Sequence, residues 1–451
     1  MQELRRFAKF IVGLQSQDIP KSVRDSANLH ILDTISAGIG ASQDSLIKRI
    51  RDQLKKYQGQ DGPCSVWGYG ETTNLTSAIF LNAMMGHLLE LDDVHTRSKT
   101  HIGTVVIPAV WGLAEQQGAT GKEMQLATIC GYEAMARVGA ALGTISHRQH
   151  GWHVTGTAGT FGAAAACGKL LHLSEDQMVW ALGLAGTQSS GLWAFLQDSA
   201  NCKILHPARA ATNGCEAALL AQCGMSGPES ILTAADGGML AAMSDHYNAD
   251  LVCDGLGEHW AIAEMDTKPY PCCRSTHSAI DAAILLKNSY SFSIKEIQSV
   301  CVETYKIGQQ QCGLSKGSLD PHTPQEAKFS TPYTVSTALL RGKVGLSDFE
   351  PAALYDPDVR SLLQKVVVHA DDRFSQLYPQ HWGCTLKIHL NDGRCLVQTI
   401  SDASGSITNP LSEEQQIAKA TQLLYYGHYD HIEGLIPNLL HTDTLSHPIS
   451  I

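Results

Sequence analysis

Basic residues are scarce in this sequence. Lysine and arginine number 33 against 44 aspartate and glutamate residues, so the net charge is −11. A nucleic-acid-binding protein needs a basic surface, and this balance argues against that class.

Long uninterrupted apolar runs are missing too. The most apolar long window, residues 178–196, is broken by glycines and a Thr-Gln-Ser-Ser stretch. We therefore expect buried helices there rather than a membrane span.

Cofactor motifs are also missing. No Walker or GxGxxG loop follows a strand and opens a helix, and no HExxH or paired-cysteine pattern predicts a zinc site. These absences disfavour nucleotide cofactors and leave a metal site without a supporting motif. The 13 cysteines are odd in number and have no repeated spacing, and we find no signal peptide. These features are typical of reduced thiols in a cytoplasmic protein.

What the sequence does contain, up to about residue 265, is helical patterning. Residues 19–42 have a proline in the first turn and apolar residues at Val23, Ala27, Ile31 and Ile35. Two later stretches, residues 157–173 and 206–224, are rich in alanine, glycine and cysteine. Small side chains let helices approach closely, so we predict a tightly packed helical core.

The pattern changes near Lys268. Residues 297–307 and 365–370 alternate like strands, and residues 383–390 and 393–400 form a predicted hairpin around Asn391-Asp392-Gly393. Helical stretches lie between them, and the chain returns to helix from about residue 402. We predict a large all-α helical domain of residues 1–265 with 402–451, and a smaller α+β domain of residues 266–401.

Residues 86–101, GHLLELDDVHTRSKTH, place acids and histidines at the end of an apolar run, and we call them the acid segment. On a helix His87, Glu90 and Asp93 would share one face while Asp92 pointed elsewhere. Such a group can act as acid and base. The alternative is a helix end whose polar groups cap the next segment. A metal site is conceivable but has no supporting motif.

Three other segments carry candidate chemistry. Residues 147–162 hold three histidines before a small-residue helix, and His153 is nearest its start. Residues 199–211 place Lys203, His206 and Arg209 around a proline, and residues 267–277 place Lys268 and Arg274 around a Cys272-Cys273 pair. Each cation alone would be a solvated side chain by default. Two cationic turns in an acidic chain favour an anion site.

Together these segments resemble the MmgE/PrpD family. The matching pieces run in family order from about residue 20 to 420: HILDTISAGIGAS, NAMMGHLLELDDVH, GWHVTGTAGTFGAAAACGKLL, ALGLAGTQSSGL, CKILHPARAATNG, KPYPCCRSTH, EAKFSTPY and NPLSEEQ. The family includes 2-methylcitrate dehydratases, cis-aconitate decarboxylases and iminodisuccinate epimerase.

The resemblance implies a homodimeric enzyme in which the α+β domain is a lid and the pocket lies between the domains. The acid segment, His101, His153 and Lys203 would form one wall, and Lys268 the other. Tyr333, in EAKFSTPY, matches a family pocket tyrosine. The resemblance also implies no metal or organic cofactor and a small carboxylic-acid substrate.

The sequence departs from the family pattern at three positions. Glu90 replaces the first aspartate of an Asp-x-Asp-Asp pattern, and Val94 replaces a threonine of decarboxylase-like members. Cys273 stands where those members have a histidine. Because that histidine is a candidate proton donor, its loss disfavours decarboxylation, and dehydration is the family-level expectation.

The predicted function is dehydration of a 2-methylcitrate- or citrate-like hydroxy acid. The alternatives are epimerisation of an iminodisuccinate-like dicarboxylate, decarboxylation of cis-aconitate, and a non-catalytic tricarboxylate sensor. Each reaction builds negative charge beside a carboxylate, which needs cations, an acid and a base. The predicted catalytic residues are Glu90, Asp93, His101, His153, Lys203, Lys268 and Tyr333, and the predicted substrate-binding residues are His206, Cys273 and Arg274.

Overall fold

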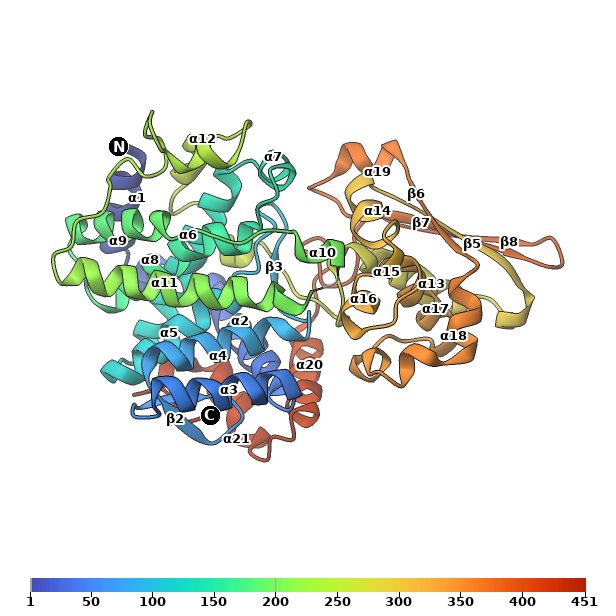
Figure 1. Cartoon of the computed structure of the whole chain (residues 1–451), viewed down its shortest axis with the longest axis horizontal. Coiled ribbons are helices and arrows are strands. Elements are labelled where there is room, and N and C mark those ends of the chain that lie inside the picture. The colour runs from blue at the N-terminus through green and yellow to red at the C-terminus, as the bar shows by residue number, and fades with distance from the viewer. Residues whose placement is uncertain (1, 199) are drawn as a thin grey trace.

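The computed structural model describes residues 2–198 and 200–451 and shows two bodies side by side (Figure 1). The helical lobe has one apolar core, which draws on residues 4–265 and again on residues 420–451. The sheet lobe has a separate core from residues 272–396. Both chain ends lie in the helical lobe (Figure 1). The protein is mostly helical, with a small sheet in its C-terminal part.

The helical lobe is built from long and short helices. They are α1 Gln2–Gly13, α2 Lys21–Ala41, α3 Ser45–Gln58, α4 Leu75–Leu88, α5 Gly103–Gln117, α6 Gly121–Ala141, α7 Thr144–Gln149, α8 Val154–Leu170, α9 Glu175–Thr187, α10 Phe195–Asp198, α11 Leu205–Gln222, α12 Met239–Met243, α20 Glu413–Tyr426 and α21 Ile432–Leu440. A short hairpin, β1 Cys64–Val66 and β2 Glu71–Thr73, joins α3 to α4.

Helix α8 lies at the centre of this lobe. Every residue of α8 except Lys169 is buried, and the helix packs against α5, α6, α9 and α11. A Cβ atom on Gly214 of α11 would lie 2.5 Å from the Thr160 carbonyl oxygen, closer than atoms can approach. The small residues therefore let these helices touch, and the predicted close packing is confirmed.

The sheet lobe has a four-stranded sheet in the order β6-β5-β7-β8. The strands are β5 Ile297–Thr304, β6 Val366–Ala370, β7 Cys384–Leu390 and β8 Cys395–Ile400, with β5 and β6 parallel and the other pairs antiparallel. The predicted hairpin is confirmed as β7-β8. Strand β5 is shorter than predicted because helix α14 begins at Lys306.

The helices of the sheet lobe are α13 His277–Ser289, α14 Lys306–Cys312, α15 Lys316–Leu319, α16 Pro324–Lys328, α17 Thr331–Arg341, α18 Pro357–Leu363 and α19 Asp372–Leu377.

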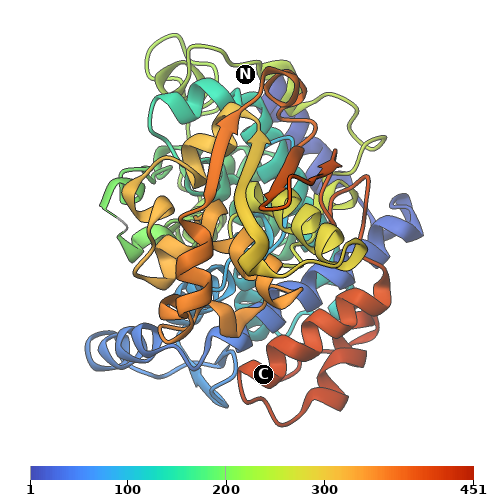
Figure 2. The ribbon, with the colours of Figure 1, turned by 90° about the vertical axis from the view of Figure 1, so that its right-hand side faces the viewer.

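The chain crosses between the lobes twice, and the two crossings lie side by side. On the way out, β4 Met265–Asp266 pairs with β3 Val94–His95 of the helical lobe. On the way back, the Gly405 carbonyl accepts a hydrogen bond from the Thr267 amide at 2.8 Å. Figure 2 shows the sheet lobe in front, with the red α20 and α21 beside it in the helical lobe.

The apolar window at residues 178–196 lies in α9 and the turn before α10, and most of α9 from Met178 on is buried. The expectation of buried helices is therefore confirmed for α9 alone, because residues 188–194 are not helical and Leu192 is 52% exposed. Among the described residues, no helix combines the length and the apolar content needed to cross a membrane.

Candidate active site

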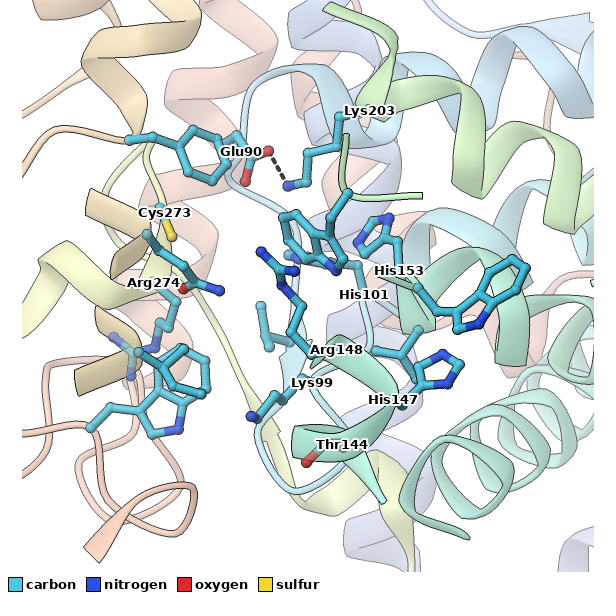
Figure 3. Close-up of a pocket in the computed structure, with 18 of the residues that line it drawn as sticks. Glu90, Lys99, His101, Thr144, His147, Arg148, His153, Lys203, Cys273 and Arg274 are labelled. Carbon is cyan, nitrogen blue, oxygen red and sulfur yellow. Dashed lines mark hydrogen bonds and ion pairs between the residues drawn. The ribbon is translucent and has the colours of Figure 1, made fainter. Parts of the chain in front are cut away.

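A cavity lies between the two lobes (Figure 3). The helical lobe contributes the acid segment, α7, the start of α8 and the segment before α11. The sheet lobe contributes the segment after β4 and the aromatic residues that follow α19. The charged, imidazole, thiol and aromatic side chains that line the cavity include those of Glu90, Lys99, His101, Arg148, His153, Trp193, Lys203, Lys268, Cys273, Arg274, Tyr378 and Trp382.

The acid segment leaves its helix earlier than its spacing predicts. Helix α4 ends at Leu88, and Glu90 has a left-handed backbone with φ of 57°. This conformation is uncommon for residues with a side chain, and after it the helical spacing no longer applies. The prediction that His87, Glu90 and Asp93 share a helix face, with Asp92 pointing elsewhere, is therefore wrong.

At one end of the cavity, which we call the paired end, Glu90 joins lysines from the two lobes. Its carboxylate accepts one hydrogen bond from Lys203 Nζ and another from Lys268 Nζ at 3.1 Å. All three residues are at most 4% exposed. Burial tends to raise the pKa of Glu90, but the two lysines outweigh it and hold this pKa well below its usual value. The lysines predicted for opposite walls thus meet at one carboxylate.

Lys268 is also 3.8 Å from Asp92 Oδ1. Burial disfavours its charged form, but Asp92 and Glu90 more than compensate and raise the pKa of Lys268. Lys268 therefore stays protonated near neutral pH, as a cation that stabilises an anionic intermediate must.

Asp92 holds two imidazoles behind the paired end. Its Oδ2 lies 2.7 Å from His101 Nδ1 and 2.9 Å from His87 Nδ1. The carboxylate favours a proton on Nδ1 of His101, which leaves Nε2 as the acceptor. Burial lowers the pKa of His101 to about 4, with Asp92 opposing and Lys268 reinforcing the shift. His101 is thus a neutral base that Asp92 orients.

Asp93 lies behind the cavity wall, away from its lining. Its Oδ1 accepts a hydrogen bond from the Gly103 amide at 2.9 Å, and its Oδ2 accepts one from the Tyr132 hydroxyl at 2.6 Å. His30 Nδ1 lies 3.2 Å from the same Oδ2. Asp93 therefore fixes the start of α5 against the core. The predicted catalytic placement of Asp93 is corrected by these contacts.

His153 occupies the N-terminal end of α8 and lines the cavity. Its Nδ1 is 2.8 Å from His206 Nδ1, so one proton lies between the two rings. Burial, then His206 and Lys203, hold the pKa of His153 well below its usual value. Burial and Lys203 also lower the pKa of His206 to about 4. Among the described residues, His206 is not part of the cavity lining, and it reaches the substrate side through His153.

Cys273 and Arg274 both border the cavity from the sheet lobe. A hydrogen bond from Cys312 lowers the pKa of Cys273 to about 7, against the opposing effect of burial. Arg274 donates to Asp266 at 3.1 Å and to the Ser404 carbonyl at 3.4 Å. Arg274 therefore ties the two chain crossings together, while the Cys273 thiol faces the cavity.

Tyr333 lies inside the sheet lobe, away from the cavity lining. It is fully buried in α17, and its hydroxyl donates to the Asp348 carbonyl. Burial raises the pKa of this hydroxyl to about 12. The family-based expectation of a pocket tyrosine is corrected here, because these contacts make Tyr333 part of the core of the sheet lobe.

Lys99 and Arg148 line the cavity but were not predicted from the sequence. Lys99 Nζ lies 4.2 Å from the ring centre of Tyr378, and Arg148 Cζ lies 4.4 Å from that of Trp193. Both residues stand in segments already chosen as candidates, which was a usable signal. A linear pattern cannot show which cations lack a carboxylate partner in the fold.

His87, Asp92 and His101 also bring three metal-binding residue types together. Both imidazoles approach one oxygen of Asp92 at direct hydrogen-bond distances, and the Lys268 ammonium 3.8 Å from the other oxygen repels a cation. These residues fit acid–base chemistry better than a metal centre.

Comparison with known families agrees with this geometry. The MmgE/PrpD N-terminal domain matches residues 5–251, and the MmgE/PrpD C-terminal domain matches residues 270–432. The chain belongs to the MmgE/PrpD family, and the resemblance found in its motifs is confirmed.

Several relatives are named as decarboxylases. Cis-aconitate decarboxylase of Aspergillus terreus is 29% identical over 426 residues, which cover 90% of this chain and 86% of the relative. Cis-aconitate decarboxylase-like protein oryM of Aspergillus oryzae is 28% identical over 424 residues, covering 90% and 87%. Human cis-aconitate decarboxylase is 26% identical over 449 residues, covering 96% and 91%. Family and relatives together indicate a lyase-type enzyme.

Proposed function

We propose that this member of the MmgE/PrpD family is a lyase that forms a carbanion-like species next to a carboxylate of a small di- or tricarboxylic acid. The reaction we propose first is decarboxylation of a cis-aconitate-like substrate. One observation carries the proposal: Lys203 and Lys268, from different lobes, meet beside a neutral histidine that a buried carboxylate orients.

The lysines supply the positive charge that the reaction needs. When the bond to the departing carboxylate breaks, its electron pair stays on the substrate and spreads towards a remaining carboxylate. Ammonium groups already in place stabilise that charge without reorganisation, and one such donor is worth about 100- to 1000-fold in rate. Glu90 holds both lysines in position before substrate arrives.

The histidines are our candidates for proton transfer. His101 presents a neutral ring whose Nδ1 is held by Asp92. His153 shares a proton with His206, and its lowered pKa keeps this pair neutral near pH 7. The ring therefore takes up a proton beside the substrate carboxylate, which raises its pKa, before it acts as an acid. We assign His153 the delivery of a proton to carbon, and His101 the removal of one where the reaction requires a base. These residues supply the acid, the base and the positive charge without a cofactor.

The relatives support decarboxylation rather than the dehydration that the sequence favoured. Their identities are 26–29%, so the exact substrate of this chain is part of the proposal. Epimerisation of an iminodisuccinate-like dicarboxylate is the second candidate, because an epimerase needs proton-transfer groups on opposite faces of one carbon. His101 on the helical wall and Cys273 on the sheet wall supply such groups.

Proton NMR in deuterated water separates these reactions. The purified protein is incubated with cis-aconitate, citrate, 2-methylcitrate and an iminodisuccinate-like dicarboxylate. Decarboxylation gives a product shorter by one carboxyl group, dehydration gives a new vinyl signal, and epimerisation gives deuterium at the α-carbon without loss of water. The Lys268→Met variant is the control for contaminating activity.

Turnover of cis-aconitate that disappears in Lys268→Met supports the proposal. Tight binding of these acids without turnover of any would contradict it and would favour a sensor of tricarboxylates.

We also propose a cytoplasmic homodimer, as the resemblance and the reduced cysteines imply. Size-exclusion chromatography with light scattering tests the dimer, and cell fractionation tests the location.

A further inference from the structure

Two cations in the cavity have no acidic partner. Across residues 2–198 and 200–451, no carboxylate lies within ion-pair distance of Lys99 or Arg148, and each cation lies over an aromatic ring instead. Both side chains are half-buried. They are close enough for Arg148 to disfavour the charge on Lys99. Two like charges held together in a partly dry place cost free energy, which a bound anion would offset.

The backbone around Lys99 is built to present this side chain. The acid segment closes a short loop in which the His95 amide donates to the Thr100 carbonyl at 2.9 Å. Lys99 lies within the loop in the left-handed region, with φ of 58°. The left-handed conformation costs free energy for a lysine, and residues held in this conformation cluster at binding sites. Figure 3 shows Lys99 in the cavity, well separated from Lys203, and we call the part with Lys99 and Arg148 the unpaired end.

The charges of the two ends differ. At the paired end, the cations Lys203 and Lys268 face the anions Glu90 and Asp92, so their charges cancel. The unpaired end carries positive charge with no compensation. A single carboxylate would therefore bind first at the unpaired end, and an anion with a second carboxylate would place it at the paired end, beside Lys203 and Lys268.

We propose that Lys99 and Arg148 bind a second carboxylate of the substrate, remote from the reacting carbon, and so select di- and tricarboxylates over monocarboxylates. This inference rests on the proposed function, since it assumes that the reacting carboxylate lies at the paired end. Trp193 and Tyr378, over which the two cations lie, exclude water from one side of each and strengthen the attraction to an anion.

The site has a measurable signature in proton uptake. Burial, and then Arg148, lower the pKa of Lys99 to about 7, so at pH 8 most of the free protein has this amine neutral. A carboxylate beside the amine raises its pKa again. Ligand binding at pH 8 should therefore take up close to one proton. Calorimetry in buffers of different ionisation enthalpy measures that uptake.

Non-reacting probes test the proposal by isothermal titration calorimetry. Propane-1,2,3-tricarboxylate, glutarate and butyrate carry three, two and one carboxylates on short chains. We expect Lys99→Met and Arg148→Met each to weaken binding of the first two by about tenfold, and the double variant by about 100-fold. Proton uptake with glutarate should fall by close to one proton in Lys99→Met, and Cys273→Ser measures any share that the nearby thiolate contributes.

The matched control is Arg97→Met, which removes a charge from an exposed residue of the same loop that lies outside this cavity. An equal loss in Arg97→Met, or no preference of the unmodified protein for glutarate over butyrate, would overturn the proposal. Unchanged binding in the double variant with a lower melting temperature would also overturn it, and would assign both cations to holding the lobes together. Because the probes do not react, these results stand whichever reaction is found.

Discussion

The two walls of the cavity are built in different ways. The helical wall brings Glu90, Asp92, His101, His153 and Lys203 together from several segments, each tied to buried neighbours. The sheet wall brings its lysine and its thiol on one short segment beside the chain crossings, together with aromatic rings. The helical wall is thus a preassembled acid–base array. The sheet wall supplies the cation without which that array carries excess negative charge.

The strongest test of this comparison removes that cation. Lys268→Met should lower turnover about 1000-fold and lower the free energy of unfolding by roughly 3–5 kcal/mol, because Glu90 and Asp92 lose a buried partner. Steady-state rates and chemical denaturation measure the two effects. The control is Lys295→Met, an exposed lysine of the same lobe. Unchanged stability of Lys268→Met would mean that Glu90 and Asp92 need no positive charge from the sheet lobe.

The next test separates two adjacent acids within the helical wall. Asp92→Asn should lower turnover at least 100-fold, because an amide no longer fixes the proton on Nδ1 of His101. Asp93→Asn should change turnover less than about tenfold but cost about 1–3 kcal/mol of stability through its contacts with Gly103 and Tyr132. Kinetics and denaturation of both variants check this division. A larger loss of turnover in Asp93→Asn than in Asp92→Asn would mean that Asp93, and not Asp92, takes part in the reaction.

A smaller effect is expected at the thiol of the sheet wall. Because the pKa of Cys273 is about 7, its thiolate fraction rises as pH passes through 7, and so should its rate of alkylation by iodoacetamide. Mass spectrometry of the labelled peptide gives the midpoint. Cys312→Ala should move it to higher pH, since the hydrogen bond that lowers this pKa is lost. A midpoint that stays near 7 in that variant would contradict this cause.

The smallest effect is expected behind the sheet wall. Tyr333→Phe removes the hydrogen bond to the Asp348 carbonyl, which should cost about 1 kcal/mol of stability. Turnover should stay within about twofold, because the ring lies outside the cavity lining. Thermal melting and steady-state kinetics measure both. A large loss of turnover with normal melting would return Tyr333 to the active site.

The sequence predicts a mostly helical chain with a small C-terminal sheet, because helix and strand leave different periods along the chain. The hairpin at β7-β8 and the small-residue contacts around α8 follow from local rules of turn chemistry and close packing. Lys203 and Lys268 were chosen because cations around prolines are unusual in an acidic chain. The family resemblance implied that they line one pocket from opposite walls, and their meeting at Glu90 is a property of the fold that the sequence did not predict.

The errors arose where tertiary contacts overrule spacing. One left-handed residue, Glu90, turns the acid segment so that Asp92 and not Asp93 reaches His101. The helical spacing of the sequence cannot predict such a left-handed residue, because the residue ends that spacing. Tyr333 was placed by motif, and a motif fixes the order of residues but not the direction of a side chain. Lys99 and Arg148 were passed over because the absence of a partner is visible only in three dimensions.

The paired crossings near Asp266 and Gly405 have a mechanical consequence. Two connections joined to each other resist twisting of one lobe against the other at this point. Lys268 follows directly after them, so the same joint that links the lobes also fixes the backbone that presents this lysine to Glu90.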